Sequence, residues 1–177
     1  MLISLRLTVG AMMTFLLFMA LALYFVLAPG SDPQPGEGLL DAPQLWVVGA
    51  LVAAGVALHL LITLVGYRTP AIAPGTPPDV AGRTSAGALS AGTMLRAALS
   101  ESVALASVAL AFLVSEGSYV TYLVGAAVSL ALFVLHAFPT ARTVDRTQAS
   151  LERAGGTSYL RERLRLPAPR AGAIQEL

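Results

Sequence analysis

The sequence predicts an all-α integral membrane protein, a bundle of four transmembrane helices with both termini on the cytoplasmic side. Three observations lead to this fold class. The mean hydropathy is +0.74, and only 12% of the 177 residues are charged, which is typical of membrane proteins and not of soluble domains. Four long apolar runs alternate with short polar segments. Every arginine falls on one side of the resulting topology.

The first two predicted spans cover residues 7–28 and 45–67. The first run is about as long as the ~20 residues that a helix needs to cross ~30 Å of hydrocarbon. A cleaved signal peptide is the alternative, but its apolar region is usually ~7–15 residues, and Pro29 stands where cleavage would fall. In the second run, Pro43 suits a helix start and Trp46 suits a membrane interface.

The third and fourth predicted spans cover residues 94–114 and 119–138, separated by the short turn "SEGS". Pro139 ends the fourth span, because proline has no N–H to donate and its ring clashes with a continuing helix. Tyr119 and Tyr122 are expected at the same outer interface as Trp46.

The basic residues predict the orientation. None of them is lysine, and all lie before the first span, between the second and third spans, at the start of the third, or after the fourth: Arg6, Arg68, Arg83, Arg96, Arg142, Arg146, Arg153, Arg161, Arg163, Arg165 and Arg170. The two remaining segments carry only acids, namely Asp32, Glu37, Asp41 and Glu116. Cytoplasmic loops are enriched in basic residues, so both termini are predicted in the cytoplasm. The all-arginine usage indicates a GC-rich bacterial genome, and hence the bacterial inner (plasma) membrane.

The polar segments between and after the spans are predicted to be a linker and a tail. The stretch "YRTPAIAPGTPPDVAGRTSAG" is rich in Pro, Gly, Ser and Thr, which predicts an irregular cytoplasmic linker. Residues 1–139 then form the transmembrane domain, and residues 140–177 form a cytoplasmic arginine-rich tail. Within the tail, "TARTVDRTQASLERAGG" predicts a short helix closed by Gly155 and Gly156.

Five tail arginines are candidate membrane-surface residues: Arg142, Arg146, Arg161, Arg163 and Arg165. An arginine near an anionic headgroup layer contributes about 1 kcal/mol of attraction. The alternative is that these residues are only the orientation signal on a solvated helix, since Asp145, Glu152 and Glu162 interleave with them. Nucleic-acid binding has little support, because the bases are few and Tyr159 is the lone aromatic of the tail.

Glu101 is the principal candidate site residue, because it stands inside an otherwise apolar span. A charge in hydrocarbon costs at least ~2.5–3.5 kcal/mol, so intramembrane carboxylates usually face a partner helix or a wet cavity. Helical spacing places Glu101 beside Ala97 and Ala104, and small residues let another helix approach. One interpretation is a protonatable relay or ion-coupling site. The alternative is a shallow acid, hydrated or hydrogen-bonded by Ser100, Ser102 or Arg96, that only helps helices to associate.

His59 is the candidate partner of Glu101. With Arg68 and Arg96 at the inner interface and ~1.5 Å of rise per residue, His59 lies ~13 Å deep and Glu101 ~8 Å deep, a difference that side chains bridge. For His59 and His136 alike, a hydrogen-bonded packing role is the alternative, because their spacing fits no metal site. Small residues expected at helix contacts are Gly55, Ala97, Ala104, Gly125 and Ser129.

The stretch "ALSESVALASVALAFLV" resembles the carboxylate-bearing helix of the ATP synthase rotor proteolipid, subunit c, with Glu101 at the position of the ion-binding acid. The resemblance implies an outward-running helix after a cytoplasmic loop, and ion or proton translocation. Residues 94–142 more closely resemble uncharacterised four-span bacterial membrane proteins that share an "AL-x-E" helix, a short outer turn and "FPTAR"-like text after the fourth span. That second resemblance implies no known activity.

From these features we expect a non-catalytic accessory or interaction subunit of a larger membrane complex, with the lipid bilayer and either other subunits or copies of itself as partners. The alternative is proteolipid-like proton or ion translocation through Glu101, together with His59. The chain has no cysteine, which excludes disulfides, thiolate metal sites and cysteine nucleophiles. It has no phosphate-cradling Gly-Lys loop and no nucleophile-elbow context. No catalytic residue, metal or cofactor is expected.

Overall fold

The computed structural model describes residues 1–27, 38–114 and 116–167, and every regular element in these ranges is helical. The acids Asp32 and Glu37 and the basic Arg170 lie outside the described residues. Four helices are long and apolar enough to span a membrane. These are α1 (Leu2–Val26), α2 (Leu45–Val65), α3 (Pro78–Leu113) and α4 (Ser118–Leu132), which continues through the π-helical turn η1 (Phe133–Ala137). The predicted all-helical fold with four spanning-length helices is therefore confirmed.

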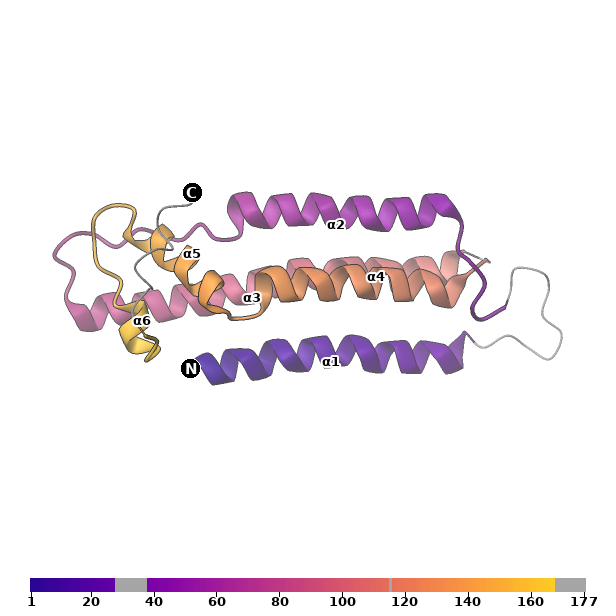
Figure 1. Cartoon of the computed structure of the whole chain (residues 1–177), viewed down its shortest axis with the longest axis horizontal. Helices are drawn as coiled ribbons and strands as arrows, with labels where there is room; N and C mark the ends of the chain where they lie inside the picture. The colour runs from indigo at the N-terminus through magenta and orange to yellow at the C-terminus, as the bar shows by residue number, and fades with distance from the viewer. Residues whose placement is uncertain (28–37, 115, 168–177) are drawn as a thin grey trace.

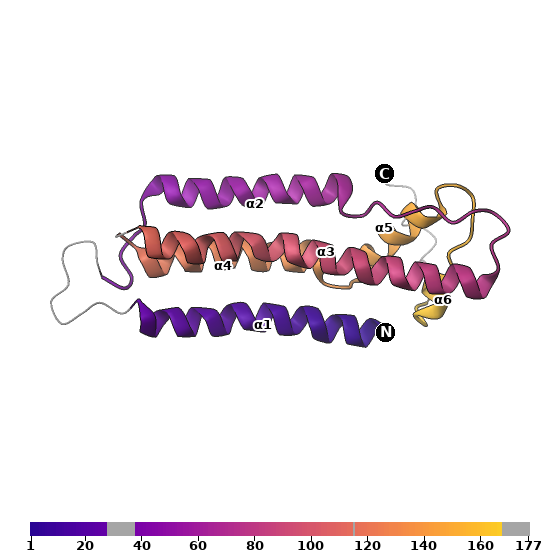
Figure 2. The same cartoon turned by 180° about the vertical axis from the view of Figure 1, so that it is seen from behind.

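The long helices form a layered bundle around a central antiparallel pair. Helices α3 and α4 make the closest association, while α1 and α2 run along opposite sides of that pair (Figures 1 and 2). We call the end at which α1 begins and α2 ends the arginine end, and the opposite end the loop end. Because each flanking helix contacts the centre along one face, most of the apolar surface of α1 and α2 stays exposed, as expected for helices solvated by lipid.

Buried polar side chains recur every seven residues where α3 meets α4 and η1. On α3 they are Thr93, Ser100 and Ser107, and Tyr122 and Ser129 of α4 and His136 of η1 follow the same interval. The Ala104 N–H donates to the Ser129 Oγ at 2.8 Å, so the two backbones lie almost in contact. A seven-residue repeat keeps one seam of two antiparallel helices facing each other along its whole length.

Two glycines allow the closest helix contacts. A Cβ atom added at Gly125 would lie well inside 3.0 Å of the Ser107 side chain and 3.2 Å from the Val103 carbonyl oxygen. A Cβ atom at Gly55 would overlap the side chain of Val128, where α2 meets α4. Both positions therefore need the absence of a side chain, the usual reason for small residues at helix contacts in membranes.

Tyr122 corrects one sequence-based expectation. Its side chain is not at an interface but fully buried, and its hydroxyl donates to the Leu16 carbonyl of α1 at 2.6 Å. Tyr119 remains partly exposed. The sequence did not reveal the difference, because the two tyrosines stand three residues apart near the start of α4 and the burial of Tyr122 depends on the position of α1.

The stretch between α2 and the third span is not an irregular linker throughout. Only residues 66–77 lack helical structure, and α3 begins at Pro78, well before the predicted start at residue 94. Pro78 stands in the first turn, where proline fits a helix because its missing N–H has no partner there. The first half of α3 runs past the ends of the other long helices (Figure 1).

This extension is stabilised by the chain after α4. The tail forms α5 (Ala141–Glu152), as predicted, and the short α6 (Leu160–Arg163). Both helices pack on the first half of α3. We call the first half of α3, α5, α6 and loop 66–77 together the cap. A buried cluster joins it to the start of α1: Leu5, Ile72, Ala81, Leu89, Val144, Leu151 and Leu160. Burial of apolar side chains outside the bundle compensates for the glycines and serines that weaken the helix locally.

Polar contacts fix the cap segments to one another. The Ile72 N–H donates to the Leu151 carbonyl at 2.8 Å, and the Ser85 hydroxyl donates to the Ser158 carbonyl at 2.8 Å. The Glu152 carboxylate accepts from the backbone N–H and hydroxyl of Ser158. A reciprocal capping box between Thr140 and Thr143 starts α5, which satisfies two backbone donors at its N-terminus. The cap is therefore an ordered extension of the bundle.

Candidate functional site

Glu101 lies on α3 at the edge of the α1 contact. Ala97 and Ala104, on the same stripe of α3, pack with Val9 and Leu16 of α1, so helical spacing directs Glu101 toward that groove. The side chain is half-buried, and within the described residues it makes no hydrogen bond or ion pair. An apolar helix thus carries an acid whose carboxylate has no partner from the described part of the chain.

His59 is paired with His136 and not with Glu101. The His59 Nδ1 and the His136 Nε2 lie 2.8 Å apart, and the two rings are 4.8 Å apart between centroids. One of these nitrogens must carry the proton and the other accept it. His59 is exposed on α2, whereas His136 is 2% exposed in η1. The pairing first expected for His59 is therefore replaced by a bond between α2 and the end of α4.

Arg96 is the largest fully buried side chain of the molecule's described part. Its Nε donates to the His136 carbonyl at 2.9 Å, one terminal nitrogen donates to the Gly66 carbonyl at 3.0 Å, and the other donates to the Thr93 hydroxyl at 3.2 Å. A single side chain of α3 therefore joins the C-terminal ends of α2 and of η1.

The environment of Arg96 explains how its charge is tolerated. Gly66 and His136 stand at helix C-termini, where unpaired carbonyls carry partial negative charge. The Arg96 guanidinium also lies over the Tyr67 ring, 4.4 Å from its centroid, which adds a cation–π attraction. In the described ranges no carboxylate bonds to Arg96. Carbonyl oxygens, a hydroxyl and an aromatic face stabilise this cation in place of an acid.

Tyr67 completes the arrangement. Its hydroxyl is 3.3 Å from the His136 Nδ1 and 3.4 Å from the His136 carbonyl oxygen. The guanidinium of Arg146, on α5, lies 5.2 Å from the centroid of the same ring. We call Tyr67, Arg96, His59, His136 and Arg146 the arginine–histidine cluster. It lies where the bundle meets the cap, and it links α2, α3, η1 and α5.

The π-helical turn places His136 in this cluster. The Phe138 N–H donates to the Phe133 carbonyl at 2.7 Å, five residues back. Such a turn shifts the helix register by one residue, and π turns often occur at functional sites. Pro139 follows directly, so the chain leaves the helix with the His136 carbonyl turned toward Arg96. Sequence reasoning missed these contacts, because it considered Arg96 as a marker of the membrane boundary or as a partner of Glu101, whereas its side chain bonds to His136, Gly66 and Thr93.

The structure also places the remaining candidate residues. Ala97, Ala104, Gly125, Ser129 and Gly55 are all buried at helix contacts. Among the tail arginines, Arg161 bonds to Asp145 and to the Pro167 carbonyl, while Arg163 lies beside Gly82. Arg142 and Arg165 are exposed, and Arg146 is half-buried. The five arginines predicted at the membrane surface therefore do not share one environment: some contact other residues of the cap, and others are exposed.

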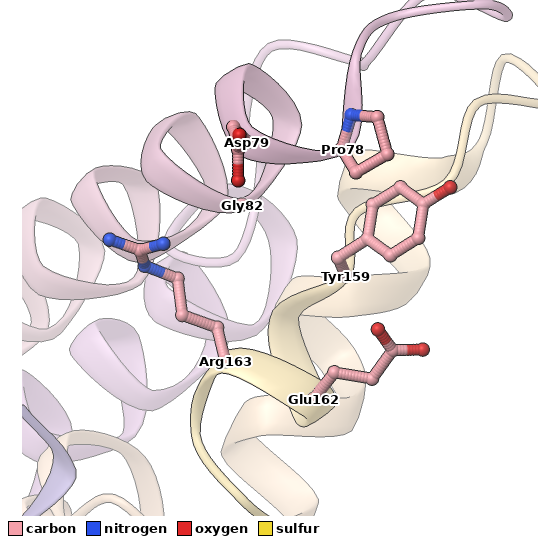
Figure 3. A pocket seen from close by; sticks show the side chains of 6 residues that line it. All are labelled: Pro78, Asp79, Gly82, Tyr159, Glu162 and Arg163. Atoms are coloured by element: carbon pink, nitrogen blue, oxygen red, sulfur yellow. The ribbon is translucent and has the colours of Figure 1, made fainter.

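The cap holds a shallow depression of about 180 Å³ between the start of α3 and α6. Figure 3 shows Pro78, Asp79 and Gly82 on α3 and, across from them, Tyr159, Glu162 and Arg163 of the tail. The depression is open to solvent and lined by charges of both signs. A second one, of about 280 Å³, lies between α5 and α6. In the described ranges no three acidic or histidine side chains converge to hold a metal ion.

Comparison of the chain with protein-family models, with curated proteins and with solved structures gave no match.

Proposed function

We propose that this chain is a multi-pass protein of the bacterial inner membrane with both termini in the cytoplasm, and that it is a non-catalytic accessory or interaction subunit of a larger membrane complex. The observation that carries the proposal is Glu101, a half-buried acid in an apolar segment that has no hydrogen-bonding partner in the described part of its own chain. In a bilayer such a group is stabilised by a polar or basic side chain of a neighbouring helix.

The surface of the bundle supports this role. Exposed α3 residues near Glu101 are small or apolar and recur at helical spacing, as in Ala98, Ser102, Leu105 and Ala109. Small residues permit close approach, and a carboxylate among them favours one specific partner helix. The arginine end, which holds the described tail arginines, suits the cytoplasmic side.

Extraction of a tagged chain at native abundance tests the proposal. In gentle detergent, sizing and mass spectrometry are expected to recover the wild type in stoichiometric complex with another membrane protein. Glu101→Leu is expected to lower that recovery by roughly tenfold, because a charge-assisted contact across the interface is lost. Glu116→Gln, at an exposed acid in the turn between α3 and α4, is the matched control. Recovery of the wild type as a free monomer or homo-oligomer would contradict the accessory role.

A second proposal is proton or ion translocation through Glu101, as in the rotor proteolipid that this helix resembles. The half-buried Glu101 carboxyl, which has no bonding partner in the described residues, favours it. The separate hydrogen-bonded chain from Tyr67 through His136 to His59 adds groups of a kind that relays protons. This chain extends from a buried hydroxyl to the exposed face of α2, which is a route for protons near the arginine end.

Proton uptake by reconstituted vesicles tests the second proposal. The wild type is expected to dissipate a pH gradient, Glu101→Gln to abolish the flux, and a hydrophobic carbodiimide, which reacts with a protonated carboxyl group, to label Glu101 and block the flux of the wild type. Glu116→Gln is again the control. A flux that is equal in wild type and Glu101→Gln, or absent from both, would exclude Glu101 as the conducting group.

A further inference from the structure

Three arginines surround the junction at which the chain leaves the bundle and enters α5. The Arg6 Nε donates to the Pro139 carbonyl at 3.1 Å, which holds the start of α1 against the residues that precede α5. Arg142 and Arg146 follow on α5, four residues apart, and therefore project from the same face of that helix. Residues distant in sequence thus bring guanidinium groups to one level of the molecule.

These charges are not balanced within the described residues. The side chains of Arg142 and Arg146 make no hydrogen bond or ion pair there, Arg146 lies over the Tyr67 ring, and Arg6 donates through Nε alone. The acid on α5 nearest to them, Asp145, is paired with Arg161. The buried Arg96, whose guanidinium also lies over the Tyr67 ring, adds a further positive charge. Like charges in a partly desolvated site repel one another unless an anion joins them.

The geometry suits an oxyanion. Tyr67 holds the Arg146 guanidinium at 5.2 Å from its ring centroid and so restrains the side chain before a ligand arrives. A guanidinium is a planar fork of donors that binds phosphate oxygens in pairs. The N–H groups of Arg142 and the terminal nitrogens of Arg6 remain available at the rim. By contrast, Arg161 already donates to Asp145 and Pro167.

We propose that Arg142 and Arg146, with Arg6 at the rim, bind the phosphate group of an anionic ligand at the arginine end, where α1 begins and η1 ends. Two sources carry this chemistry: the headgroup of an anionic phospholipid, and free phosphate. A phospholipid fits the position, since basic pockets beside transmembrane helices hold anionic headgroups. The site is independent of any role for Glu101.

The test uses the full chain purified in neutral detergent and loaded with phosphatidylglycerol, with phosphatidylcholine as the neutral lipid and inorganic phosphate as the free anion. Native mass spectrometry is expected to show retained phosphatidylglycerol on the wild type, and Arg142→Gln with Arg146→Gln is expected to reduce retention by roughly tenfold. The matched control is Arg163→Gln with Arg165→Gln, at two exposed tail arginines that leave the Arg161–Asp145 pair intact; it removes the same charge from the same tail and is expected to retain the lipid.

The outcomes separate the sources. Retention of phosphatidylglycerol with no thermal stabilisation by millimolar phosphate identifies the headgroup, and stabilisation by phosphate alone, lost in the double variant, identifies the free anion. The single change Arg142→Gln alters an exposed side chain without a hydrogen bond and is expected to leave the fold intact. A loss of lipid retention in this variant therefore reports on binding and not on unfolding. Equal losses in the two double variants, or no binding of either probe by the wild type, would overturn the proposal.

Discussion

Replacing Arg96 with methionine is expected to destabilise the protein by about 3–5 kcal/mol. Methionine keeps the length of the side chain but leaves the carbonyls of Gly66 and His136 and the Thr93 hydroxyl without their donor. Each buried acceptor left unpaired costs about 1–3 kcal/mol. For a chain of this size such a loss lowers the midpoint of thermal unfolding by roughly 10 °C, measured as the loss of monodisperse protein after heating in mild detergent.

Arg96→Lys gives the graded comparison. An ammonium group supplies donors but no planar fork, so it reaches one of the two carbonyls and recovers part of the stability. Arg83→Met, at an exposed position of the same helix, is the control and is expected to change the midpoint little. If Arg96→Met unfolds at the same temperature as the wild type, Arg96 does not join α2 to η1 as its hydrogen bonds indicate.

Gly125→Ala is expected to have the second largest effect, a loss of about 1–3 kcal/mol. The added methyl group would overlap the Ser107 side chain and meet the Val103 carbonyl oxygen at 3.2 Å. A carbonyl within a helix cannot move aside alone, so α3 and α4 must separate along their seam. The same heating assay measures the loss.

Two further variants test the assignment to steric overlap. Gly49→Ala adds a methyl group on α2 where no atom lies within 4 Å, and it is expected to be neutral or to stabilise by about 0.5–1 kcal/mol. Ser107→Gly combined with Gly125→Ala removes the clashing side chain, so the pair is expected to recover part of the loss, as coupled neighbours do in a double-mutant cycle. Equal destabilisation by Gly125→Ala with and without Ser107→Gly would contradict a direct contact.

The four long helices were predictable because hydropathy over some twenty residues is a local property of the chain. The extension of α3 was not, because Gly82, Ser85 and Gly87 indicate a loop when considered alone. Their helical state depends on Val144, Leu151 and Leu160, which return to this stretch from the other end of the chain. Tertiary burial therefore outweighs local propensity here.

The candidate site was predictable only in part, for a related reason. Hydropathy singled out Glu101 as an acid among apolar residues, and the helical spacing of Ala97 and Ala104 placed it on a packed stripe. The bonds of Arg96 had no such signal, because two of its partners are backbone carbonyls that any residue supplies. Likewise, the contact between His59 and His136 depends on the register of α2 against α4, which no local pattern specifies.

The unbroken course of α3 has a mechanical consequence. Its 36 residues, at ~1.5 Å each, make a rod of roughly 54 Å, and no flexible joint separates the part inside the bundle from the part in the cap. A displacement or rotation of the cap is therefore transmitted along α3. It would move the contact between α3 and α4 and the side of α3 that carries Glu101. A molecule that bound the cap and rotated it would therefore change which side of α3 is exposed at the surface of the bundle.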